Sequence, residues 1–233
     1  EMAYIGSSTT VLGFLCHKMP SEGGYTFVSD SVQATNAILA TPFGQKLKDL
    51  GICYHRNLTD RREFVGVPEV GVYNHWQQSM MTEDPDEAIA EARKRGLDAE
   101  WGDNGLLKTR YTVSAFEYFP QLDRNLLYSS MADDSAWFDT WPLVQHLPIS
   151  DRPLKLTFGD GSEMTYDEKQ LFLDVYDDYG IPIEWEVGDV ALICNYRFAH
   201  GRPAVHVKEG EERELGVLIG DAFDRLQTFD DKW

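Results

Sequence analysis

Hydrophobic and polar residues alternate along several short stretches of the chain, at the period of a β-strand that buries one face. The first two stretches, "TVLGFLCH" at residues 10–17 and "YTFVSD" at 25–30, flank the turn-forming "KMPSEGG". A last strand is predicted to begin at Glu214, in "ELGVLIGD". Between these lie further predicted strands, at residues 52–58, 107–113, 126–130 and 190–195.

Helical patterns interrupt these strands. Residues 32–50 are predicted to form one helix that Gly51 ends. Asp84 followed by Pro85 predicts another helix start, because aspartate caps the first amide groups and proline suits the first helical position. This second helix is expected to stop at Gly96.

Two further helices are expected. Thr165 and Glu168 have the T-x-x-E spacing of a capping box, which predicts a helix over residues 166–179. His75 and Trp76, in "YNHWQQ", are predicted to lie on a short amphipathic helix.

The order of these elements predicts the fold class. Strands with irregularly inserted helices argue against a doubly wound parallel sheet, and neither a G-x-G-x-x-G nor a Walker motif indicates a nucleotide site. An antiparallel sandwich or jelly roll with helical insertions fits better. Because no repeat or linker divides the chain, residues 1–233 are predicted to form a single domain.

Composition narrows the range of partners. The formal charge of -18 disfavours binding to nucleic acids and to anionic membranes, although it allows a small anionic ligand held by a buried arginine. The three cysteines lack metal-site spacing and are predicted to be reduced and buried, as in a cytoplasmic protein. No apolar run has the length of a membrane span. Since the chain starts with Glu1, we expect a fragment, whose N-terminal targeting signal cannot be judged.

One of the six histidines stands apart. His200 follows a predicted buried strand and precedes Gly201, which lets other groups approach closely. The residues alone leave open whether His200 is a metal ligand, a base or a structural strand end. A hydrolase is disfavoured, because the chain has no G-x-S-x-G elbow and no cysteine in a recognisable histidine setting.

Longer motifs carry a resemblance to a known family. "W-x-x-GDV-x-L-x-x-N-x-x-x-x-HGR", from Trp185 to Arg202, resembles the C-terminal motif of the taurine dioxygenase-like (TauD/TfdA) iron(II)/2-oxoglutarate oxygenases. "EMAY" at the start, "GGYT" at residues 23–26 and "TFGDG" at 157–161 are most similar to the branch of clavaminate synthase-like and syringomycin-biosynthesis hydroxylases. The resemblance spans essentially the whole chain and implies a double-stranded β-helix, or jelly roll, lacking its N-terminal portion.

The resemblance also implies an activity and a set of ligands. Members of the family oxidise a small molecule with O2 while converting 2-oxoglutarate to succinate and CO2, on an iron(II) held by two histidines and one carboxylate. By this resemblance Glu1 and His200 are metal ligands, with the second histidine expected two residues before Glu1. Thr26 and Arg213 correspond to the residues that bind 2-oxoglutarate, and an arginine suits a carboxylate because its planar fork binds in bidentate fashion.

Two departures from the family pattern affect the prediction. No H-x-D or H-x-E occurs in the chain, so either the chain is truncated or it is a variant that binds iron poorly. Val217 stands where the taurine enzyme has an arginine for the sulfonate, which disfavours a sulfonate substrate. An amino acid or a natural-product intermediate is expected instead. The candidate substrate-binding residues are Lys108, Arg110, Ser130 and Arg202.

A competing hypothesis remains open. A jelly-roll protein that has lost its metal would act as a binding or interaction module. The residue two positions before Glu1 discriminates between the two hypotheses, because a histidine there favours the enzyme.

Overall fold

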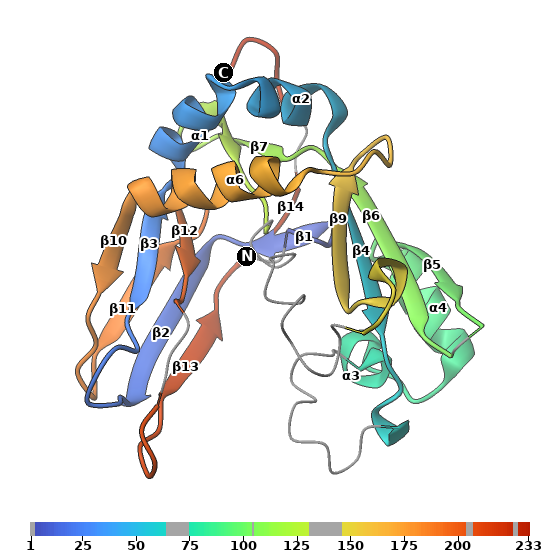
Figure 1. The fold of residues 1–233 in the computed structure, drawn as a ribbon, viewed down its shortest axis with the longest axis horizontal. Helices are drawn as coiled ribbons and strands as arrows, with labels where there is room; N and C mark the ends of the chain where they lie inside the picture. Colours follow the sequence, from blue (N-terminus) through green and yellow to red (C-terminus); the bar gives the residue numbers. More distant parts are fainter. Residues whose placement is uncertain (1–2, 64–74, 104, 131–145, 204–206, 226–227) are drawn as a thin grey trace.

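The protein forms an arch of two β-sheet arms joined by helices (Figure 1). The computed structural model describes residues 3–63, 75–103, 105–130, 146–203, 207–225 and 228–233. The helices α1 (Ser31–Leu39), α2 (Pro42–Leu50) and α6 (Tyr166–Asp178) lie across the top of the arch. The predicted architecture, mainly β with helical insertions, is confirmed.

One arm is a sandwich of two three-stranded antiparallel sheets. The first sheet has the order β10 (Gly180–Ile183), β3 (Thr26–Asp30), β12 (Phe198–Gly201). The second has the order β11 (Val190–Cys194), β2 (Val11–Lys18), β13 (Glu214–Ile219).

The core of this sandwich follows from the alternation along β2. Leu12, Phe14 and Cys16 are buried and pack with Trp185 and Ile193, while partly buried side chains of both sheets close the cluster. Each sheet therefore buries its apolar face against the other, as expected for a jelly roll.

The other arm is a four-stranded antiparallel sheet. Its apolar face packs against the short helix α3 (Trp76–Met80) and against α4 (Pro85–Lys94), around the buried Leu58, Trp76 and Leu107. The strand order is β5 (Asp98–Trp101), β6 (Leu107–Val113), β4 (Ile52–Leu58), β9 (Leu154–Phe158).

Two further antiparallel pairs of short strands belong to the arch. β1 (Ser7–Thr9) pairs with β14 (Ala222–Asp224), which brings the two ends of the chain together. β7 (Phe116–Phe119) pairs with β8 (Arg124–Leu127). The largest hydrophobic cluster unites β7, β8 and β14 with α1, α2, α6 and the four-stranded sheet. It also contains Ala199 of β12 in the sandwich, so it joins the two arms. Two 3-10 turns, Arg61–Glu63 and Ile149–Asp151, complete the described elements.

The helix predicted over residues 32–50 is divided in two, which corrects the sequence-based prediction. Thr41 caps α2 by accepting a hydrogen bond from Gly44 N, and Pro42 takes the first helical position. Proline lacks the amide hydrogen that a continuous helix requires, so the chain turns and starts again. The predicted stop at Gly51 is confirmed, with a φ of 69° that suits glycine.

The capping predictions are confirmed elsewhere. Asp84 accepts hydrogen bonds from the amides of Asp86 and Glu87, and Thr165 forms the complete capping box with Glu168. His75 is not on the helix but occupies its N-cap position without a side-chain cap hydrogen bond, and its ring Nδ1 lies 3.0 Å from Thr59 Oγ1.

The strand that contains His200 also differs from the prediction. β11 ends at Cys194, and the chain reverses at residues 195–197 before β12 begins in the opposite sheet. β11 is not buried on both faces, since Val190 and Leu192 are 66% and 76% exposed. His200 therefore belongs to a strand and a sheet of its own, separate from the apolar run that precedes it.

The cysteines are free, as predicted. Cys16 and Cys53 are buried, whereas Cys194 is half-buried. Within the described ranges, no helix combines the length and the apolar character that crossing a bilayer requires.

Candidate functional site

His200 lies on the inner side of the sandwich. Its register partner on β3 is Val28, and its ring packs edge-on against Phe14 of the opposite sheet, with ring centroids 5.4 Å apart. Burial lowers the pKa of His200 to about 4, so the imidazole is neutral at neutral pH. A neutral imidazole is the form that binds a metal ion.

Thr26 and Arg213, the two residues that the resemblance assigns to 2-oxoglutarate, lie together. Arg213 Nη2 donates a hydrogen bond to Thr26 Oγ1 at 3.3 Å, and Arg213 Nε donates to the Gly24 carbonyl at 2.7 Å. Trp185 Nε1 donates a second hydrogen bond to the same threonine oxygen at 3.0 Å. The guanidinium is thus fixed in direction by two acceptors, and the threonine by two donors.

A chain of contacts joins this pair to His200. Trp185 packs against Phe14 with ring centroids 6.4 Å apart, and Phe14 in turn packs against His200. Thr26 is also two positions before Val28, the register partner of His200. The predicted metal ligand and the predicted 2-oxoglutarate residues therefore line one end of one sandwich.

The positive charges of Arg213 and Arg202 act on each other at this end. Burial lowers the pKa of Arg213, and the nearby charge of Arg202 lowers it further. Arginine nevertheless stays protonated in proteins. No carboxylate among the described residues forms an ion pair with either arginine. Two neighbouring guanidinium groups without an acidic partner are suited to an anionic ligand.

The Cys16 thiol lies in the same region and has a raised pKa. Cys16 is 1% exposed, and burial, followed by the charge of Asp189, holds its pKa above the usual value. The thiol is therefore protonated and unreactive, and it serves as part of the apolar core.

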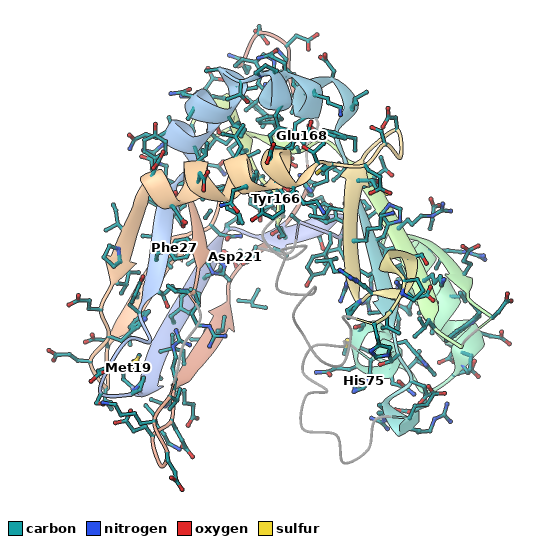
Figure 2. All side chains as sticks on the ribbon, in the orientation of Figure 1. Met19, Phe27, His75, Tyr166, Glu168 and Asp221 are labelled. Carbon is teal, nitrogen blue, oxygen red and sulfur yellow. The ribbon has the colours of Figure 1, made fainter. Side chains whose placement is uncertain are left out.

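The glycine after His200 is required by a close approach, as predicted. A Cβ atom on Gly201 would lie 2.2 Å from the tip of the Phe27 ring, its register partner on β3. Figure 2 shows Phe27 on the sandwich arm, whereas His75 lies on the other arm. Gly201 thus allows the two strands to pair beside His200.

The metal site is only partly within the described residues. Glu1, the predicted carboxylate ligand, lies outside them. Within the described part of the chain, no group of three or more histidine, cysteine or acidic side chains is placed to hold a metal ion. His200 is the described member of the predicted ligand set.

The structure places Lys108 and Arg110 in the arm that does not contain His200. Lys108 and Arg110 lie on β6, in the other arm, where they line a groove of about 790 Å³. Lys108 Nζ is 3.2 Å from Asp151 Oδ1. Ser130 is 8% exposed, and its amide donates to Tyr54 Oη at 3.1 Å. The charge of Arg202 acts on the Thr26–Arg213 pair, because it lowers the pKa of Arg213.

Sequence reasoning missed the role of Trp185. In the sequence Trp185 appeared only as the first residue of a motif. In the structure its indole donates a hydrogen bond to Thr26, which is 159 residues away in the sequence. Asn195 likewise appeared only as a letter of the same motif. Its Nδ2 donates to the Thr9 carbonyl at 2.7 Å and to Tyr128 Oη at 2.9 Å. Neither contact has a local sequence signal.

Comparison with known proteins places the chain in a family. Residues 1–218 match the model of the taurine catabolism dioxygenase TauD, TfdA family. The match covers most of the chain, so the chain belongs to this family. The resemblance identified from the motifs is therefore confirmed.

Individual relatives agree with this assignment. A clavaminate synthase-like protein of Arabidopsis thaliana is 27% identical over 206 residues, covering 87% of this chain and 59% of the relative. The dapdiamide synthesis protein DdaC of Enterobacter agglomerans is 24% identical over 217 residues, covering 90% and 61%. The chain thus spans about three fifths of the length of these curated relatives.

Solved structures of the same kind are also similar. A taurine dioxygenase from Burkholderia xenovorans is 14% identical, with 97% of this chain and 60% of that chain covered and a TM-score of 0.47. A putative alpha-ketoglutarate dependent 2,4-D dioxygenase from the same organism is 17% identical, with coverages of 93% and 64% and a TM-score of 0.46.

Proposed function

We propose that the protein is an iron(II)- and 2-oxoglutarate-dependent dioxygenase that oxidises a small molecule. The observation that carries the proposal is the Thr26–Arg213 pair, which is fixed at the same end of the sandwich as His200. This arrangement agrees with membership of the TauD, TfdA family.

The residues of the chain fit an iron site in part. His200 supplies a neutral imidazole, Glu1 is the proposed carboxylate ligand, and a second histidine is proposed two residues before Glu1. Iron(II) held by these two imidazoles and one carboxylate would supply the activation of O2. The protein's own contribution is to orient the ligands and to keep the site apolar around Phe14 and Trp185.

Binding of 2-oxoglutarate is assigned to Arg213 and Thr26. The Arg213 guanidinium is partly desolvated and lacks a described acidic partner, so a ligand carboxylate would complete its pairing. The Thr26 hydroxyl is held next to the guanidinium and offers a further polar contact. Arg202 reinforces the positive potential at the same place.

The substrate is proposed to be an amino acid or a natural-product intermediate. Val217 offers no charge to a sulfonate and is 55% exposed. The names of the relatives, a clavaminate synthase-like protein and a dapdiamide synthesis protein, agree with such chemistry. Lys108, Arg110, Ser130 and Arg202 remain the proposed substrate contacts, and the charge of Arg202 acts on Arg213.

The test is the formation of succinate from 2-oxoglutarate by the protein as encoded, with any residues that precede Glu1. We expect succinate only when iron(II) and O2 are present, with an increase when a panel of amino acids contains the substrate. Absence of succinate under all of these conditions would contradict the proposal.

The metal-free binding module is the alternative outcome. A residue other than a metal ligand two positions before Glu1, together with iron-free purified protein, would favour it. Small-molecule and O2 partners, rather than nucleic acid or a membrane, and a cytoplasmic location remain part of the proposal.

A further inference from the structure

The groove of the four-stranded arm lies on the polar face of its sheet. Leu58 and Leu107, which pack with α3 and α4, belong to the other face, because side chains alternate along a strand. The groove has a volume of about 790 Å³, and its lining includes four basic or imidazole side chains of the sheet: His55, Lys108, Arg110 and Lys155. This surface belongs to a different arm from the Thr26–Arg213 pair.

The strand register gathers these four side chains around one point. On β4, His55 is the register partner of Arg110 on β6 and of Lys155 on β9. Neighbouring strands lie about 4.8 Å apart, so the two cationic residues flank the imidazole on either side. Lys108 is two positions before Arg110 on β6, which places it on the same face, about 7 Å along the strand. Three permanent cations therefore surround His55.

Carboxylates beside the groove orient the two lysines. Lys108 Nζ lies 3.2 Å from Asp151 Oδ1, and Lys155 Nζ lies 2.7 Å from Glu163 Oε1. The lysine side chains are 31% and 21% exposed, so both ammonium groups are partly sheltered from water. An ammonium group has three donors. Each lysine can therefore donate to a second anion while it keeps its carboxylate partner.

Arg110 differs from the two lysines in its pairing. No described carboxylate forms an ion pair with its guanidinium, although Asp98 is its register partner on β5. Four cationic and two acidic side chains line the groove, in a chain whose formal charge is -18. The two acidic ones, Asp98 and Glu100, lie on the edge strand β5, which β6 separates from His55. The centre of the groove is thus locally positive.

We propose that this groove binds a small oxyanion with two negative charges, either inorganic phosphate or a phosphate ester, over His55. A phosphate group offers at least three strong acceptor oxygens, enough for Arg110, Lys108 and Lys155 at the same time. The planar fork of an arginine suits such an anion, and a carboxylate, with one charge and two oxygens, would match fewer of these donors. The site requires neither iron nor 2-oxoglutarate, so the inference goes beyond the proposed function and does not depend on it.

Phosphate affinity is the quantity that tests the groove. We would titrate the protein as encoded with inorganic phosphate at constant ionic strength and follow the heat of binding. The variants Arg110→Gln and Lys155→Gln each remove one charge-assisted hydrogen bond, so the dissociation constant should rise roughly 10- to 100-fold in each. Circular dichroism verifies that both variants are folded.

Two control variants separate the groove from other positive charges. Lys18 of β2, in the sandwich, is 52% exposed and is paired with Glu212 and Glu214. Lys18→Gln therefore removes a paired lysine outside the groove and should leave the phosphate affinity unchanged. Arg213→Ala removes the arginine proposed for 2-oxoglutarate, where phosphate might otherwise bind, and should also keep the affinity of the wild type.

A second ligand distinguishes the two sources of the oxyanion. Phosphoserine carries a phosphate ester, and serine, which lacks it, is the matched control that should not bind in the groove. Binding of phosphoserine with the same sensitivity to Arg110→Gln supports a phosphate ester as the ligand. Binding of inorganic phosphate alone supports the free ion.

The contradicting outcomes are equally specific. Absence of phosphate binding by the wild type overturns the proposal, and so does equal affinity in the wild type, Arg110→Gln and Lys155→Gln. A comparable loss in Lys18→Gln shows a general effect of charge and overturns it as well. Loss in Arg213→Ala with retention in Arg110→Gln assigns phosphate to the other arm. None of these results bears on succinate formation, so failure of the groove and failure of the proposed function are distinguishable.

Discussion

Arg213 and Thr26 are 187 residues apart in the sequence, yet Arg213 Nη2 donates to Thr26 Oγ1 at 3.3 Å. Arg213 directly precedes β13 in one sheet of the sandwich, and Thr26 opens β3 in the other. The hydrogen bond therefore crosses the open end of the sandwich. It fixes a guanidinium next to the strand that pairs with the His200 strand.

Replacement of Arg213 should impair the use of 2-oxoglutarate. Arg213→Ala leaves a ligand carboxylate desolvated and unpaired, which costs about 2 kcal/mol or more. The half-saturating concentration of 2-oxoglutarate, measured by succinate formation, should therefore rise by roughly 30-fold or more. Arg213→Lys, which keeps the charge without the fork, should lie between this variant and the wild type. An unchanged half-saturating concentration in Arg213→Ala would remove Arg213 from the site.

Removal of the Thr26 hydroxyl should destabilise the fold. Thr26→Val leaves the buried Trp185 Nε1–H without its acceptor, at a cost of about 1–3 kcal/mol in the free energy of unfolding. Urea denaturation measures this difference. Thr26→Ser retains the oxygen and serves as the control, so the account fails if both variants unfold at the same urea concentration.

Local signals in the sequence predicted much of the fold. The caps at Asp84 and Thr165 and the stop at Gly51 were identified because a short motif satisfies the backbone at a helix end. Thr41–Pro42 carries a signal of the same kind, which the prediction of one long helix overlooked. A helical period continues across such a break, so periodicity alone did not reveal it.

Gly201→Ala should show how closely the strands approach beside His200. The added methyl group would lie 2.2 Å from the Phe27 ring, and overpacking of this kind costs about 1–3 kcal/mol. Thermal unfolding should therefore show a lower melting temperature, and the double variant Gly201→Ala/Phe27→Leu should recover part of it. Gly6→Ala is the control, because its nearest contact would be 3.4 Å away. A Gly201→Ala melting temperature equal to that of Gly6→Ala would contradict the close approach.

The positive charges of Lys108 and Arg110 in the four-stranded arm should not affect the binding of 2-oxoglutarate. Lys108 and Arg110 lie on β6, whereas the Thr26–Arg213 pair belongs to the sandwich. The double variant Lys108→Ala/Arg110→Ala should therefore keep the wild-type half-saturating concentration of 2-oxoglutarate, whatever its effect on the substrate. A rise comparable to that in Arg213→Ala would show that the arms share one site.

Only those residues of the candidate site that belong to a recognisable motif could be predicted from the sequence. The assignment of Thr26, His200 and Arg213 came from resemblance, and the structure brings these three to one end of the sandwich. The turn at Asn195, which moves His200 into the opposite sheet, depends on tertiary pairing between β12 and β3. The hydrogen bond between Trp185 and Thr26 joins residues far apart in the sequence, so no local sequence pattern indicates it.

The central claim is that His200 holds the iron on which turnover of 2-oxoglutarate depends. The most direct measurement compares succinate formation by the wild type, His200→Ala and His17→Ala, each as the encoded protein supplied with iron(II). His17 is an exposed residue of β2 in the same sandwich and provides the matched control. We predict that His200→Ala loses succinate formation while His17→Ala retains it. Undiminished succinate formation by His200→Ala would contradict the account.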